Sequence, residues 1–131
     1  MEMRQAKELL HLQHWLAMAA ELVQRGRDNY NSDPFQQEAG DSLMMKIGEV
    51  ARRLDRMGYA PPKKITWTDA SDNRNYLLHD YDAVSRNVTW QTLSVDLPEW
   101  GRAFAKSFVE ARQVIGQGGH LEKQSDQHAQ E

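Results

Sequence analysis

The sequence has no cysteine and no long apolar run, and each absence excludes a class of protein. Without cysteine the chain cannot form disulfides, thiolate zinc sites or a cysteine nucleophile. No apolar stretch approaches the roughly 20 residues that a helix needs to span a bilayer, so we expect no membrane partner. The first residues also lack the apolar segment of a secretion signal. We therefore expect a cytoplasmic protein, and the absence of disulfides is compatible with that compartment.

The sequence also lacks a basic surplus, because its formal net charge is −3. A dedicated binder of duplex nucleic acid usually carries an excess of lysine and arginine. Any contact with nucleic acid must therefore come from a local feature. One basic run is interrupted by Asp55 and consists of Arg52, Arg53, Arg56, Lys63 and Lys64. It could steer RNA electrostatically, although a solvated helix face is the default interpretation.

Apolar residues recur at helical spacing through nearly the whole chain. The first predicted helix carries its apolar stripe at Leu9, Leu12, Leu16 and Val23. It fades near Gly26, and residues 27–32 are predicted to form a loop. The second helix should begin at Asp33 as cap with Pro34 in its first turn, and it should end at Gly58. Its apolar seam, at Leu43, Ile47, Val50 and Leu54, is typical of helices packed in a bundle.

Three further helices are predicted after the break at Pro61-Pro62. The third should begin with a capping box formed by Thr66 and Asp69 and should end near Tyr81 or Asp82. A short fourth helix is expected over residues 86–95. The last helix should start at Asp96 as cap, with Pro98 and Glu99 in its first turn and a buried stripe that includes Trp100, Phe104 and Phe108.

These elements predict an all-α fold, an antiparallel helical bundle of four longer helices plus a short helix. The bundle domain should cover residues 1–115. The remainder, 116–131, is rich in glycine, glutamine and charged residues, and we expect a disordered polar tail there.

Side chains suited to chemistry gather on the third predicted helix, between Arg74 and Tyr81. Asn75 and His79 are four residues apart and share a helix face. Arg74 and His79 are five residues apart, so they point about 140° away from each other around the helix axis. A second copy of the helix, supplied by a two-fold dimer, would bring both residue types to one target.

Arginine and histidine together suit the cleavage of RNA without a metal. The guanidinium offers a planar fork of donors that matches phosphate oxygens, and histidine exchanges a proton near neutral pH. The ribose 2′-hydroxyl would be the nucleophile, His79 would transfer the proton and Arg74 would stabilise charge on phosphorus. Asn75 could hold the imidazole or the phosphate. From spacing alone, however, a solvated helix face is the commoner explanation of such a pair.

The pattern Arg74, four residues, His79, one residue, Tyr81 resembles the signature of the HepT-like branch of the HEPN proteins, in which a polar residue such as Asn75 follows the arginine. Other segments agree with that family in order and spacing: residues 47–54, Trp67, Trp90 and Asp96-Leu97-Pro98. The likeness covers about residues 5–115. It departs after Tyr81, where the family often has an aromatic residue and a glycine and this chain has Asp82-Ala83.

The resemblance implies a fold, an activity and a partner. HepT-like proteins are helical bundles that form homodimers with a composite cleft, and they are ribonuclease toxins that cleave tRNA or mRNA rather than DNA. Each is paired with a minimal nucleotidyltransferase antitoxin, which uses ATP and magnesium to attach AMP to the motif tyrosine. By this likeness Arg74 and His79 are catalytic, Asn75 supports them and Tyr81 is the AMP acceptor. The nuclease itself needs no metal or cofactor.

Other interpretations stay open. His11 and His14 are three residues apart and could ligate a metal, although a surface or core role is commoner. Glu49 could pair with Arg74 or could be a solvated carboxylate. The tryptophans are expected to fill the core rather than to stack on bases. The whole chain could also be a non-catalytic helical binding module that docks a nucleotidyltransferase partner.

Overall fold

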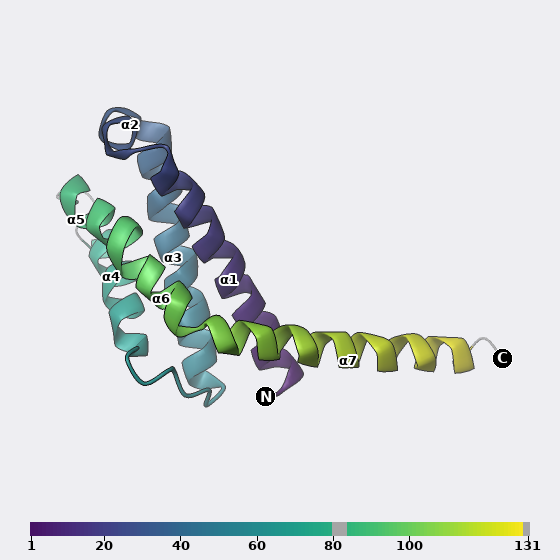
Figure 1. Ribbon diagram of the computed structural model, residues 1–131. Coiled ribbons are helices and arrows are strands. Elements are labelled where there is room, and N and C mark those ends of the chain that lie inside the picture. The colour runs from purple at the N-terminus through teal and green to yellow at the C-terminus, as the bar shows by residue number, and fades with distance from the viewer. Residues whose placement is uncertain (80–83, 130–131) are drawn as a thin grey trace.

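The computed structural model describes the backbone of residues 1–79 and 84–129, and side chains as far as residue 118. Every regular element in these ranges is helical, as the sequence predicts (Figure 1). The long helices α1 (Met3–Gln24) and α3 (Pro34–Arg56) lie antiparallel, and α4 (Trp67–His79) packs on the other side of α3. The predicted all-α helical bundle is therefore confirmed. No helix in the described ranges has the length and apolar character needed to cross a membrane.

The connection between α1 and α3 differs from the prediction. Residues 27–32 were expected to be a loop, and they form the short helix α2 (Arg27–Ser32). Gly26 enters this helix with a φ of 93°, a conformation that glycine adopts at little cost. The Tyr30 side chain is fully buried, and its hydroxyl lies 2.6 Å from the Thr89 hydroxyl. A contact so distant in the sequence stabilises a helix that local patterning does not reveal.

Helix α3 begins and ends as predicted. The Asp33 side chain accepts a hydrogen bond from the Phe35 amide at 2.9 Å, and Pro34 occupies the first turn. The chain leaves the helix through Gly58, which has a φ of 73°. Both signals act within a few residues, so the sequence is sufficient to place this helix.

Helix α4 begins at the predicted point without the predicted capping box. The Thr66 hydroxyl makes no hydrogen bond to Asp69; instead the Asp69 amide donates to the Thr66 carbonyl at 3.3 Å. The buried Trp67 fixes this end of the helix, because its indole N–H donates to the Tyr59 carbonyl at 3.0 Å. The predicted end near Tyr81 or Asp82 lies outside the described residues.

The fourth and fifth predicted helices are joined without a break. Helix α5 (Arg86–Gln91) continues through a π-helical turn, η2 (Thr92–Asp96), into α6 (Leu97–Ala103). Asp96 has helical backbone angles and its side chain makes no capping hydrogen bond, so its prediction as a cap is wrong. Since the preceding turn already satisfies the backbone, no free helix end is left to cap.

Helix α7 (Ala105–Ala129) begins after a turn at Phe104 and projects from the bundle (Figure 1). Its first half packs against α1. The helix extends past residue 115, where the sequence predicts the folded domain to end, and that domain boundary stays a prediction.

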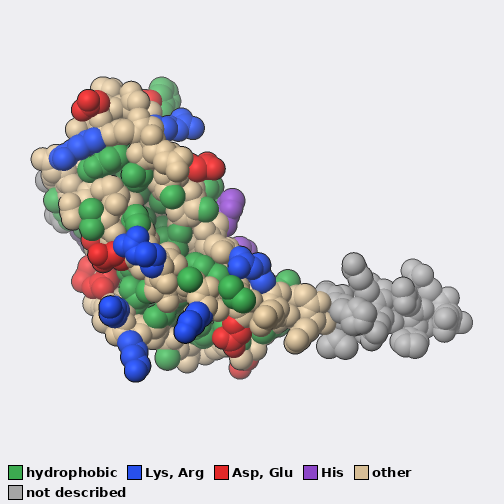
Figure 2. Space-filling view, viewed as in Figure 1, with side chains coloured by type: hydrophobic (Ala, Val, Ile, Leu, Met, Phe, Trp, Pro, Cys, Tyr) green, Lys and Arg blue, Asp and Glu red, His purple; other side chains and the backbone are tan. Residues whose placement is uncertain are grey.

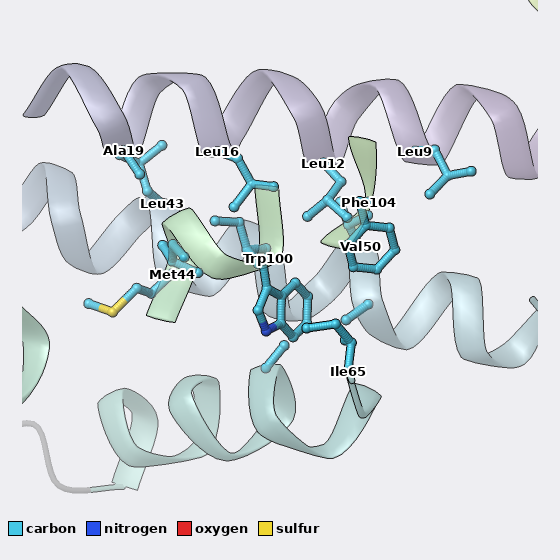
Figure 3. Close-up of a cluster of buried hydrophobic side chains, with 14 of the residues drawn as sticks. Leu9, Leu12, Leu16, Ala19, Leu43, Met44, Val50, Ile65, Trp100 and Phe104 are labelled. Atoms are coloured by element: carbon cyan, nitrogen blue, oxygen red, sulfur yellow. The ribbon is translucent and has the colours of Figure 1, made fainter. Parts of the chain in front are cut away.

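The core lies where α1, α3, α4 and the α6–α7 junction meet (Figure 3). Leu9, Leu12, Leu54 and Phe104 are fully buried in it. Phe104 stacks on Phe108, and Trp67 and Trp100 surround it with ring centroids 5.6 and 5.7 Å away. Trp67 and Trp100 are buried, which confirms their prediction as core residues. Burial of each large apolar side chain contributes about 1.5–3 kcal/mol, so this cluster holds the start of α4 firmly.

Candidate functional site

The Arg74 side chain lies in the contact between α4 and α3. Gly48 of α3 is buried directly beneath it, and a side-chain carbon at this glycine would lie only 2.9 Å from the Arg74 Cβ. Non-bonded carbons prefer a separation of about 3.5–4.0 Å, so the two helices approach closely at this crossing. Arg74 is consequently half-buried rather than fully solvated.

The guanidinium of Arg74 has an unsatisfied donor. Its Nε is buried and finds no hydrogen-bond partner among residues 1–79 and 84–118. No ion pair joins Arg74 to Glu49, which is exposed on the same helix as Gly48. A buried donor left unpaired costs about 1–3 kcal/mol, more where the group is charged. An anionic partner bound at this position would remove that cost.

Two other predicted motif residues are on the solvent side of α4. Asn75 and His79 are both exposed and lie one turn apart. His79 is the last described residue of the helix. One copy of the chain forms no hydrogen bond between Arg74 and His79. Tyr81 lies outside the described residues.

A tyrosine of α4 anchors the chain at Ser85, just before α5. The Ser85 amide donates to the Tyr76 hydroxyl at 2.8 Å, and the Tyr76 ring packs against the core. Sequence reasoning singled out Tyr81 and missed Tyr76. The i to i+9 hydrogen bond carries no local sequence signature that could have revealed it.

A second polar network holds α5 against α3, and the sequence did not predict it. Arg86 donates to both carboxylate oxygens of Asp41, at 2.9 and 3.1 Å, and to the Tyr30 hydroxyl at 3.3 Å. The hydrogen bonds to Asp41 raise the pKa of Arg86 further above its already high value, so its charge is permanent. The network fixes the position of Arg86, the first residue of α5.

Comparison with known proteins bears directly on α4 and its candidate site residues. The chain matches the HepT-like ribonuclease family over residues 12–106, a span that includes α3, α4 and every candidate site residue. This chain belongs to the HepT-like ribonuclease family.

A curated protein is also similar in sequence. It is named "Putative RNase TTE0752", from Caldanaerobacter subterraneus subsp. tengcongensis, and is 25% identical over 93 residues. The alignment covers 68% of this chain and 83% of the relative. No solved structure matches the chain.

In this HepT-like chain the two histidines considered as possible metal ligands each lie against another side chain. The His11 Nδ1 lies 3.8 Å from a carboxylate oxygen of Glu8. The His14 ring packs on the Trp15 ring, with ring centroids 4.8 Å apart. In the part of the chain that the structure describes, no group of three or more histidine or acidic side chains could hold a metal ion. One member of the predicted basic run already has an acidic partner, because the Arg53 Nε lies 3.0 Å from a carboxylate oxygen of Glu8.

An acidic hollow of about 360 Å³ lies on a different side of α4. Asp69 and Asp72 of α4 line it with Asp96 and Glu99, whereas Arg74, Asn75 and His79 do not. Desolvation and the charges of Glu99 and Asp69 raise the pKa of Asp96. On the face in Figure 2 acidic and basic side chains are interspersed with hydrophobic ones. Lys64 also lines the hollow, but the four carboxylates outnumber it, so the Arg74 side of α4 is the more favourable approach for a phosphate.

Proposed function

We propose that this HepT-like chain is a metal-independent endoribonuclease toxin that cleaves tRNA or mRNA through Arg74 and His79. One observation carries the proposal beyond family membership. The family motif places on one helix an exposed histidine and an arginine whose buried Nε has no hydrogen-bond partner among the described residues. The arginine supplies a fixed positive charge for a phosphate, and the histidine supplies a mobile proton.

The chemistry needs only these groups and the RNA. His79 accepts the proton of the ribose 2′-hydroxyl as the 2′-oxygen forms a bond to phosphorus. The bond from phosphorus to the 5′-oxygen breaks, and that oxygen takes a proton from the protonated His79 or from water. The products are a 2′,3′-cyclic phosphate and a 5′-hydroxyl. Arg74 stabilises the charge on the phosphoryl oxygens, and Asn75 orients the imidazole or the phosphate.

A homodimer completes the site in this proposal. Arg74 is directed toward α3 whereas His79 is exposed at the end of α4, so one copy does not aim both at one phosphate. Leu78, between them in sequence, keeps 46% of its surface exposed. A two-fold axis beside α4 would cover Leu78 and bring His79 of one copy toward Arg74 of the other.

The proposed partner is a minimal nucleotidyltransferase antitoxin that transfers AMP to Tyr81. An adenylate there would add a negative phosphate seven residues from Arg74 in the sequence and compete with the RNA phosphate. The antitoxin supplies the ATP and magnesium chemistry, so the toxin itself requires no cofactor. The proposed setting is the cytoplasm, where RNA and antitoxin are both present.

The test is cleavage of a defined tRNA and a defined mRNA by the purified wild type and by His79→Ala. Loss of general acid–base catalysis should lower the rate by roughly 10²–10⁴-fold. His14→Ala is the matched control, because His14 is an exposed histidine outside α4 and should retain full activity. If His79→Ala cleaves as fast as the wild type, the proposed site is wrong. A wild type that binds a nucleotidyltransferase yet cleaves no RNA would favour the non-catalytic binding module.

A further inference from the structure

We propose that Gly48 is a positioning residue for Arg74, because its missing side chain lets the stem of Arg74 lie flat against α3 and fixes the direction of the guanidinium. This inference rests on the proposed function, in which Arg74 binds the reacting phosphate. It assigns a role to a residue of another helix that never touches the RNA.

The contacts at Gly48 involve parts of α4 that cannot rotate away. A side-chain carbon there would lie 2.9 Å from the Arg74 Cβ and 3.0 Å from the Ala70 carbonyl oxygen. Both atoms are fixed by the α4 backbone. Since non-bonded carbons prefer about 3.5–4.0 Å, an alanine at this position has to push α4 away from α3.

The same contact orders the Arg74 side chain. The Arg74 Cδ would lie 3.3 Å from that added carbon, so the aliphatic stem crosses directly over the glycine. The neighbouring Nε is buried, which places the first donor of the guanidinium at a defined position. Holding a flexible side chain in its productive direction before substrate arrives lowers the entropy cost of binding the transition state.

Gly40 provides a matched control on the same helix. It is buried like Gly48, and an added carbon there would also meet a neighbour at 2.9 Å. Its three nearest atoms, however, belong to the side chains of Leu93, Tyr30 and Leu22, none of which is part of α4. Gly40→Ala therefore disturbs the packing of α3 at a different position and does not touch α4. Gly101, with nothing within 4 Å, is a second control in α6.

The kinetic experiment compares wild type, Gly48→Ala, Gly40→Ala and Gly101→Ala on one short RNA substrate. Misplacement of a catalytic group by about 1 Å can cost as much as 100-fold, so Gly48→Ala should lower kcat roughly 10- to 100-fold with little change in KM. The two controls should keep the wild-type kcat. An equal loss of kcat in Gly40→Ala would show that packing of α3 in general is responsible, and the proposal would be wrong.

A second measurement needs no catalytic activity, and its main comparison is made within the wild type. In ¹⁵N-labelled wild type the Arg74 Nε–H resonance, assigned with Arg74→Lys, should exchange with water at least tenfold more slowly than those of the exposed Arg52 and Arg56. Gly48→Ala should shift this resonance and speed its exchange, whereas Gly40→Ala should leave it unchanged. Exchange in the wild type as fast as at Arg52 would overturn the positioning role. If the wild type cleaves no RNA but the Arg74 resonance is protected, the proposed function fails and the placement of Arg74 stands.

Discussion

Arg86 and Asp41 form a two-pronged ion pair, with N–O distances of 2.9 and 3.1 Å, that joins α5 to α3. The side chains keep only 28% and 15% of their surface exposed, so neither charge is well solvated without the other. The pair lies in the network with the buried Tyr30 and Thr89 and secures the chain after the motif helix.

Removal of one partner should therefore destabilise the fold. Asp41→Ala leaves the Arg86 charge partly buried and should lower the free energy of unfolding by about 1–3 kcal/mol. Urea denaturation followed by circular dichroism measures the loss. Asp28→Ala, in the exposed part of α2, is the control and should change stability by no more than about 0.5 kcal/mol. Equal urea midpoints for Asp41→Ala and wild type would show that the ion pair contributes nothing to the free energy of unfolding.

Local and distant signals explain how much of the fold the sequence revealed. The ends of α3 were predictable because Asp33, Pro34 and Gly58 each act on the next few residues of backbone. Helix α2 was missed because Tyr30 is held by Thr89, which is far away in the sequence. The cap at Asp96 was predicted wrongly, because a π-helical turn joins α5 to α6 without the break that a cap requires.

The candidate site depends on local and distant signals in the same way. Helical spacing was sufficient to predict that one helix does not aim Arg74 and His79 at one point, whereas the choice of Arg74, Asn75 and His79 rested on the family resemblance and stays a prediction. The burial of Arg74 was not predictable, because it depends on Gly48 of a different helix. The Tyr76–Ser85 hydrogen bond was missed for the same reason.

Asp96 makes the stability of the fold depend on pH, in a direction that follows from its raised pKa. Its pKa is raised in the folded protein above the ordinary value of about 3.9, so above that pH the folded state holds more protons than the unfolded state. Stability contributed by this group is present below the unfolded pKa and falls as pH rises through the folded pKa. Asp96→Asn should be more stable than wild type at pH 7, by about 0.5 kcal/mol or less because the site is exposed.

The comparison is made by urea denaturation at pH 7 and pH 3. The advantage of Asp96→Asn should vanish at pH 3, where the wild-type carboxyl is protonated. The side chain makes no capping hydrogen bond that the amide would lose. A variant that is less stable than wild type at pH 7 would contradict the assignment of the raised pKa.

The composite site predicts complementation between two inactive variants. Arg74→Ala and His79→Ala should each be inactive alone. A mixed dimer contains one site with an intact arginine from one copy and an intact histidine from the other. Mixing the two variants after partial denaturation should therefore restore about a quarter of wild-type activity. That value is expected for random reassociation with one intact site in each mixed dimer. A mixture as inactive as its components, or light scattering that shows a monomer at micromolar concentration, would contradict a site shared across the dimer.

Tyr81 is expected to be regulatory rather than catalytic. A phenol is a poor proton carrier at neutral pH because phenols in water ionise only near pH 10, but it is a suitable acceptor for an activated AMP. Tyr81→Phe should keep most ribonuclease activity and escape neutralisation by the co-expressed nucleotidyltransferase. Mass spectrometry should find the AMP increment on Tyr81 of the wild type. An increment on another residue, or normal neutralisation of Tyr81→Phe, would show this assignment to be wrong.

The central claim is that Arg74 and His79 cleave RNA by using the 2′-hydroxyl of the substrate itself. The most direct measurement is the chemical nature of the ends produced from a synthetic RNA in the presence of EDTA, alongside the same RNA with a single 2′-deoxyribose at the cleavage site. The account predicts a 2′,3′-cyclic phosphate and a 5′-hydroxyl from the first RNA, and no cleavage at that site in the second. Loss of cleavage in EDTA that magnesium restores, or equal cleavage of the 2′-deoxy substrate, would contradict it.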